Sequence, residues 1–280
     1  MAVSISNAFV TLFDSEVKQA YQGQRLLAGV TRERTGVEGS TVKFPKIGKG
    51  SATIRVPQTD VTPLNVSYSQ VTATMEDYIA AEYSDIFNQQ KVNFNDRQEL
   101  VQVVSGAIAR RMDQIVLDAL DASGTTATVS NDIGGTDTNL NIEKLRETKN
   151  LLDTNNVPME GRCMLLHANS LQSLLGETEV TSSDFNSVKA LVTGEVNTFM
   201  GFRFITFGDR DEGGLPIDGS SDRTLYAFHR DAMGLGIGMN QTSRVDYIPE
   251  KTSFLVASMF SAGAVAIDDE GIVKITCRES

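Results

Sequence analysis

The longest regular pattern of apolar positions in the chain falls between residues 96 and 122. Apolar side chains recur there at steps of three or four residues, which is the spacing of one face of an α-helix. Asn95 and Asp96 favour a helix start, and Gly124 is typical of a helix end. Such a helix would be roughly 40 Å long, so the pattern predicts a rod that organises the chain around it. Its apolar stripe consists of Val101, Val104, Ile108, Met112, Ile115 and Ala119.

Residues 36–75 follow a different pattern, in which apolar and polar residues alternate as they do in β-strands. The alternation is found in three runs, at residues 41–44, 52–56 and 65–68. Pro45, Pro57 and Pro63 lie in or beside these runs, and proline cannot donate a hydrogen bond to a neighbouring strand. The pattern therefore predicts an extended two-stranded hairpin. An isolated hairpin is marginally stable, so we expect this one to lie on another surface.

The remaining elements are shorter. Helices are expected at residues 14–27, 142–153 and 170–175, and strands at residues 162–167, 201–205, 224–228, 254–260 and 272–277. Residues 184–196 are helix or loop, and residues 209–223 are expected to form a mobile acidic loop. Because strands and helices are segregated rather than alternating, the pattern indicates the α+β class.

Composition excludes several classes of protein. Hydrophobic residues make up 40% of the 280 residues and charged residues 22%, as in ordinary globular chains. The formal net charge of −11 argues against a general nucleic-acid-binding protein. Cys163 and Cys277 are too few and too far apart for a disulfide framework or a cysteine metal site. The longest uncharged stretch, residues 252–267, is shorter than the roughly 20 apolar residues that span a bilayer, so no membrane partner is expected.

Charge is unevenly distributed around the predicted hairpin. Residues 39–59 contain basic but no acidic side chains, and residues 60–90 contain acidic but no basic ones. The basic residues are Lys43, Lys46, Lys49 and Arg55, and the acidic ones are Asp60, Glu76, Asp77, Glu82 and Asp85. This arrangement predicts complementary charge contacts, and the alternative is a solvated hairpin with ordinary lysines.

Motifs of catalysis and cofactor binding are incomplete throughout. The glycines of residues 234–238 resemble a dinucleotide fingerprint, but the third comes one position early and no helix follows. Residues 48–51 lack the first glycine and the Ser/Thr of a P-loop, and residues 137–141 lack the glycine of a calcium loop. His229 has no nucleophile turn to serve, and His167 is expected to be a satisfied core histidine. We therefore expect no catalytic residue, no cofactor and no metal.

Taken in order, these elements resemble the major capsid proteins of tailed double-stranded-DNA bacteriophages, which have the Hong Kong 97-type fold. Four stretches agree with it locally: residues 109–115 with the spine helix, 164–168 with the strand that opens the axial domain, and 201–205 and 227–233 with later strands. The resemblance covers nearly the whole chain, although no single motif in it is specific.

The resemblance implies how the chain is divided. The expected units are an N-terminal arm (1–35), an extended β-hairpin arm or E-loop (36–75), a peripheral domain (76–160) with the spine helix at 96–122, an axial domain (161–244), and C-terminal strands returning to the peripheral domain (245–280). It also implies inter-subunit contacts, for which the candidates are Lys43, Lys46, Lys49, Arg55, Glu76, Asp77, Glu82 and Asp85.

The same resemblance implies function. Members of this family build an icosahedral shell of hexamers and pentamers around the phage genome, without catalysis. The expected location is the virion, assembled in the host cytoplasm, with double-stranded DNA enclosed but not bound sequence-specifically. Many members begin with a long cleaved scaffolding segment. Only about 35 residues precede the hairpin here, which suggests a separate scaffolding protein and no cleavage, although a chain trimmed to its mature form would look the same. A portal is the other partner that the resemblance implies.

Three alternatives stay open at this point. A bacterial nanocompartment shell would share the fold but hold a different cargo. A phage tail or fibre subunit would be dominated by strands, which the long helix argues against. A hydrolase using His229 with a serine would need the nucleophile turn that the sequence lacks.

Overall fold

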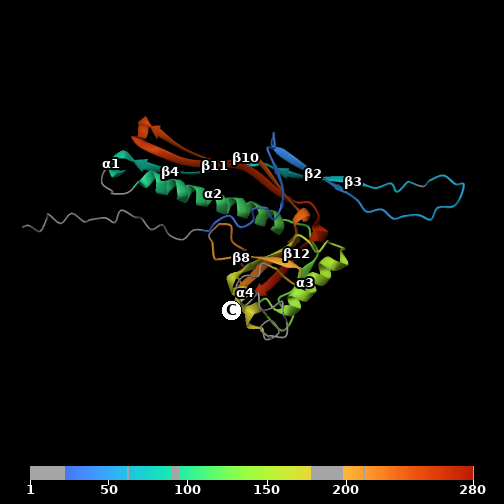
Figure 1. Cartoon of the computed structure of the whole chain (residues 1–280). Coiled ribbons are helices and arrows are strands. Elements are labelled where there is room, and N and C mark those ends of the chain that lie inside the picture. The colour runs from blue at the N-terminus through green and yellow to red at the C-terminus, as the bar shows by residue number, and fades with distance from the viewer. Residues whose placement is uncertain (1–22, 62, 90–94, 178–197, 211, 280) are drawn as a thin grey trace, which may run out of the picture.

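A computed structural model describes residues 23–61, 63–89, 95–177, 198–210 and 212–279 of the chain. Figure 1 shows an elongated layer, a second layer packed below one end of it, and a hairpin that extends away from both. The elongated layer is a four-stranded sheet in the order β1-β10-β11-β4. Its strands are β1 (Arg32–Thr35), β10 (Met233–Ile248), β11 (Ser253–Ala266) and β4 (Glu76–Asp85), and the short helix α1 (Ile86–Gln89) follows β4.

The predicted long helix is confirmed as α2 (Asp96–Asp121), which runs along one face of this sheet (Figure 1). Four of the six stripe positions, Val104, Ile108, Met112 and Ile115, are buried. Asn95 precedes the first residue of the helix, as expected, but its side chain makes no capping hydrogen bond. Acidic residues in the first turn still favour the positive end of the helix dipole.

The second layer is a six-stranded sheet in the order β5-β12-β9-β6-β8-β7. It contains β5 (Thr128–Val129), β6 (Arg162–His167), β7 (Thr198–Phe199), β8 (Phe202–Phe207), β9 (Asp222–His229) and β12 (Ile272–Arg278), with helices α3 (Ile142–Thr154) and α4 (Ala168–Gly176) beside it. All six residues of β6 are buried, including the polar residues Arg162 and His167 at its two ends. The segregation of sheets and helices confirms the α+β class.

The hairpin arm, residues 36–75, contains a separate two-stranded sheet of β2 (Thr41–Ile47) and β3 (Tyr68–Thr74). The strand expected at residues 41–44 is confirmed and longer. The strand expected at residues 65–68 lies at residues 68–74 instead. The strand expected at residues 52–56 is not formed, because this stretch has no partner strand among the described residues.

Two further expectations need correction. The boundary placed between residues 244 and 245 falls inside β10, and β12 joins the six-stranded sheet rather than returning to the sheet on α2. The reason is pairing, since β12 lies beside β9. Of the helix expected at 14–27, only residues 23–27 are described, and they are not helical. The stretch at residues 184–196 lies outside the described residues.

Candidate assembly surface

The arm is anchored at its root by a small apolar cluster. Val42, Phe44 and Ala73 are buried together with Ile267, which follows β11. β2 is therefore an amphipathic strand: one of its faces packs on the rest of the subunit, and the other faces solvent. The surface that the hairpin pattern required is the end of the subunit's own four-stranded sheet.

The glycine pattern in β10 makes room for this root. A Cβ added to Gly234 would lie 2.8 Å from the ring of Phe44, and one added to Gly236 would lie 2.5 Å from Val42 Cγ1. Both distances are shorter than real contacts allow. The glycines that resemble a nucleotide fingerprint thus belong to a strand and allow the arm to approach it closely.

Two of the candidate lysines are paired within their own chain. Lys46 Nζ lies 2.8 Å from Asp268 Oδ1, and Lys49 Nζ lies 2.5 Å from Glu270 Oε2. The hydrogen bond that Lys49 donates to Glu270 raises the pKa of Lys49. These pairs connect the arm to the turn between β11 and β12, which is more than 220 residues away in the sequence.

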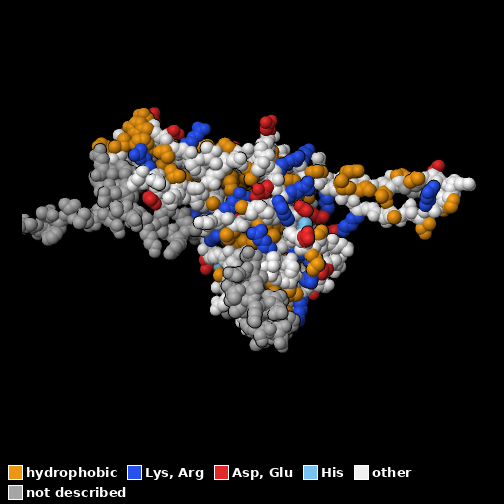
Figure 2. All heavy atoms as spheres, viewed as in Figure 1, with side chains coloured by type: hydrophobic (Ala, Val, Ile, Leu, Met, Phe, Trp, Pro, Cys, Tyr) orange, Lys and Arg blue, Asp and Glu red, His pale blue; other side chains and the backbone are white. Residues whose placement is uncertain are grey.

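The other two candidates remain exposed. Lys43 and Arg55 make no side-chain hydrogen bond or ion pair to any described residue, and Arg34 contacts only the backbone carbonyl of Lys43. Around them the arm carries large apolar side chains in solvent, and Figure 2 shows these side chains along the extension. They are Ile47, Ile54, Val56, Val61, Leu64 and Tyr68, each more than half exposed.

The acidic candidates lie together on β4, at the edge of the four-stranded sheet. Glu76 accepts a hydrogen bond from Tyr78 of the same strand, and Glu82 accepts one from the backbone N–H of Tyr83. Asp85 accepts the backbone N–H of Phe87. These contacts are local, and Glu76, Asp77 and Glu82 remain exposed, whereas Asp85 is half-buried. Asp60 lies in the loop of the arm instead, apart from the strand.

A buried carboxylate joins three parts of the subunit. Asp113 of α2 is fully buried and accepts backbone N–H groups from Leu26 and Leu27 at 2.9 and 3.1 Å. Its Oδ2 also lies 3.3 Å from Arg210, in the loop after β8. Burial raises the pKa of Asp113, while the two N–H groups and Arg210 oppose this shift. Nothing in the sequence pattern distinguishes this aspartate from its exposed neighbours.

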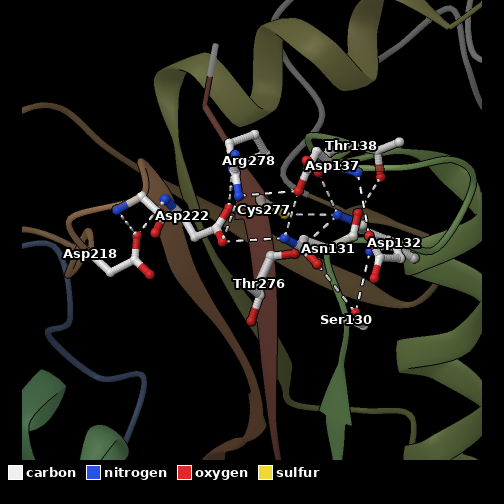
Figure 3. Close-up of polar contacts among 12 residues, drawn as sticks. Ser130, Asn131, Asp132, Asp137, Thr138, Asp218, Asp222, Thr276, Cys277 and Arg278 are labelled. Atoms are coloured by element: carbon white, nitrogen blue, oxygen red, sulfur yellow. Dashed lines mark hydrogen bonds and ion pairs between the residues drawn. The ribbon is translucent and has the colours of Figure 1, made fainter.

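An arginine near the C-terminus, Arg278, forms ion pairs with two aspartates from other parts of the chain. Figure 3 shows Arg278 between Asp222 and Asp137. Arg278 Nε lies 2.5 Å from Asp222 Oδ1, and Arg278 Nη2 lies 3.1 Å from Asp137 Oδ1. The side-chain amide of Asn131 donates to both carboxylates. The hydrogen bond from Arg278 lowers the pKa of Asp222. In the described part of the chain, no group of His, Cys, Asp and Glu is arranged to hold a metal ion.

Beside this cluster a lysine is buried without a carboxylate. Lys144 Nζ donates to the backbone carbonyls of Thr138 and Thr276 at 2.7 and 3.0 Å, and burial lowers its pKa. Burial also raises the pKa of Cys277 to about 12 and that of Cys163 above its ordinary value. Both thiols are therefore protonated near neutral pH and lack the thiolate that reactive cysteines use.

The two histidines are held by structural contacts. His229 Nε2 donates to the Glu160 carbonyl at 2.8 Å, and Nδ1 accepts the backbone N–H of Asp231. With both ring nitrogens engaged, His229 has no free nitrogen for a serine. His167 is buried, as expected, and its Nδ1 lies 2.9 Å from Glu279. Among the described helices, none is both long enough and apolar enough to cross a bilayer.

Solved structures share this fold over nearly the whole chain. The head structure of Helicobacter pylori bacteriophage KHP40 matches with a TM-score of 0.78 at 11% identity, covering 98% of both chains. The capsid structure of cyanophage P-SCSP1u matches with a TM-score of 0.77 at 14% identity, covering 100% of this chain and 96% of that one. The capsid of a native GTA particle matches with a TM-score of 0.71 at 11% identity, covering 99% and 98%.

The likeness to these structures shows the Hong Kong 97-type fold. The sequence model of the phage capsid protein family matches residues 5–279. The chain belongs to this family. Comparison with curated proteins finds no match. The family and the similar structures favour a capsid over the nanocompartment and tail alternatives.

Proposed function

We propose that copies of this chain form the hexamers and pentamers of an icosahedral shell around double-stranded DNA, with the arm as a contact between neighbouring subunits. The arm itself carries this proposal. It extends from the body with large apolar side chains in solvent, including Ile54 at 95% exposure. A soluble protein that exposes such a patch generally covers it with a partner.

Charge supports a second copy as that partner. Each subunit carries a basic arm and an acidic edge strand, so two copies can pair one with the other. Because Lys46 and Lys49 are already paired within the chain, Lys43 and Arg55 are the arm's available cations. On the acidic side the candidates are Glu76, Asp77, Glu82 and Asp85.

The remaining roles follow from the same proposal. The subunit acts as structure and not as an enzyme, in the virion, after assembly in the host cytoplasm with a separate scaffolding protein and portal. Its net charge of −11 disfavours tight phosphate binding, which suits a container that must load and release its DNA. DNA is therefore enclosed without recognition of its sequence.

A charge-reversal experiment tests the role of the arm. Lys43, Lys46, Lys49 and Arg55 are changed together to Glu, and sedimentation velocity with negative-stain imaging follows assembly at low and high ionic strength. The expected result is a folded subunit that makes no shells, and a parent whose assembly weakens with salt, because screening acts on exposed charges. Shells formed equally well by the variant would contradict the proposal. For added negative charge, Lys43→Glu with Arg55→Glu is compared with Lys149→Glu and Arg203→Glu, away from the arm, because each pair of changes shifts the net charge by the same amount.

A further inference from the structure

The outer edge of β4 is unpaired. β4 forms a ladder with β11 on one side, and no other described strand pairs with it. The backbone N–H of Tyr83 donates to the Glu82 side chain at 3.1 Å rather than to a strand, so it points to the open edge. Because the direction of backbone groups alternates along a strand, Ile79 and Ala81 present their N–H and C=O groups to the same edge.

One segment of the arm has a strand-like sequence but joins no sheet. Residues 52–56 alternate as a strand does, yet they form no strand in the subunit. Ile54 is 95% exposed and Val56 56% exposed. The segment therefore has the sequence of a strand and no sheet to join.

The segment and the edge lie far apart within one subunit. Figure 1 shows the loop between β2 and β3 pointing away from the body, whereas β4 runs along α2 in the other direction. The segment of one chain cannot reach the edge of the same chain, and a second copy can supply it.

The faces of the two elements match. On β4, Ile79, Ala81 and Tyr83 share one face, and Ile79 and Tyr83 are 67% and 42% exposed. Glu82 lies on the other face and is exposed. In the segment, Ile54 and Val56 share one face and Arg55 lies on the other.

We propose that residues 52–56 of one subunit add as a fifth, antiparallel strand to the outer edge of β4 in a neighbouring subunit, with Arg55 opposite Glu82. Ile54 then lies opposite Tyr83, and Val56 opposite Ala81. A slip of one residue would bring Arg55 to the apolar face. The antiparallel direction follows that of the β10-β11-β4 ladder and is the commoner pairing. This inference rests on the proposed function of the arm and specifies its partner surface.

The pairing assigns different roles to adjacent residues. Ile54 and Val56 exchange backbone hydrogen bonds with Tyr83 and Ala81, whereas the N–H groups of Thr53 and Arg55 face away. Main-chain bonds of this kind provide affinity when a strand joins a sheet edge, and side chains provide specificity.

A charge swap tests the side-chain pair. Arg55→Glu and Glu82→Arg are each expected to reduce the yield of sedimenting shells about tenfold, and the double variant to restore it to within about twofold of the parent. Glu76→Arg combined with Arg55→Glu is the control, and in this variant the yield of shells should stay as low as in Arg55→Glu alone. If the double variant yields no more shells than the single variants, the proposal is overturned.

Two proline variants test the backbone bonds. Ile54→Pro removes an N–H that the pairing uses, so it should block assembly, whereas Thr53→Pro removes one that faces away and should assemble as the parent does. Neither should change the melting temperature of the subunit, because the segment forms no ladder there. Equal assembly by both would overturn the strand addition while leaving the shell function intact. A parent chain that forms no shells would overturn both.

Discussion

The carboxylate of Asp113, in the middle of α2, accepts the backbone N–H of Leu27 at 3.1 Å. This contact holds the N-terminal segment against the long helix, while Arg210 brings a loop of the other layer to the same carboxylate. The charge is buried completely. Its contribution to stability is therefore tied to its protonation state.

The first prediction concerns the pH dependence of that contribution. Burial raises the pKa of Asp113, so the folded subunit binds this proton more tightly than the unfolded chain does. The corresponding stability is present at low pH and is lost as pH rises through the folded pKa. Relative to Asp113→Asn, which does not titrate, the parent's free energy of unfolding should rise as pH is lowered from 7 toward about 4.

Urea unfolding of both proteins at several pH values measures this difference, with Asp118→Asn as the control for losing a carboxylate of the same helix. A difference that falls with decreasing pH would contradict the assignment. Asp113→Ala leaves the N–H groups of Leu26 and Leu27 without their partner, and it should cost about 1 to 3 kcal/mol.

The second prediction concerns the close approach of the arm to β10. Gly236→Ala places a methyl group against Val42, and overpacking of this kind costs about 1 to 3 kcal/mol. Adding Val42→Ala should recover part of the loss in thermal unfolding. Gly208→Ala is the control, since a Cβ there meets nothing within 4 Å. Equal effects of Gly236→Ala and Gly208→Ala would show that the root of the arm does not pack as described.

The long helix and the buried strand β6 could be predicted because their signals are local. The stripe of α2 repeats over many turns, and every residue of β6 is apolar or buried by its position in the middle of a sheet. The hairpin was also predictable from its alternation. Each of these patterns predicts its element correctly because the apolar side chains of the element pack together on one surface.

Elements that depend on distant partners could not be predicted in this way. β10 contains glycines and a polar stretch, and it is a 16-residue strand because β11 pairs with it along its length. The Lys46–Asp268 pair joins residues 222 positions apart. Conversely, residues 52–56 have a strand pattern but no partner strand in the part of the chain that the structure describes. Tertiary pairing decides each of these cases.

The third prediction concerns the buried lysine of α3. Lys144→Met keeps the length of the side chain but removes the donor to the carbonyls of Thr138 and Thr276. The loss should be about 1 to 3 kcal/mol, measured by urea unfolding. Lys149→Met on the same helix is the control. An equally large loss of unfolding free energy in that variant would show that the buried contacts of Lys144 do not stabilise the subunit.

The fourth prediction separates the two kinds of basic residue on the arm. Lys46→Glu with Lys49→Glu reverses two pairs inside the subunit, so it should increase hydrogen exchange around Asp268 in the unassembled protein. Lys43→Glu with Arg55→Glu should leave that exchange unchanged and reduce assembly alone. An exchange increase in the second variant would mean that these residues also act within the subunit.

Cryo-electron microscopy of the particles formed by the expressed chain, with its scaffolding protein where this is needed, tests the central claim most directly. The account predicts closed shells of hexamers and pentamers in which the arm of each subunit lies along β4 of a neighbour. Open or irregular oligomers, or closed shells in which the arm projects into solvent without touching another subunit, would contradict it.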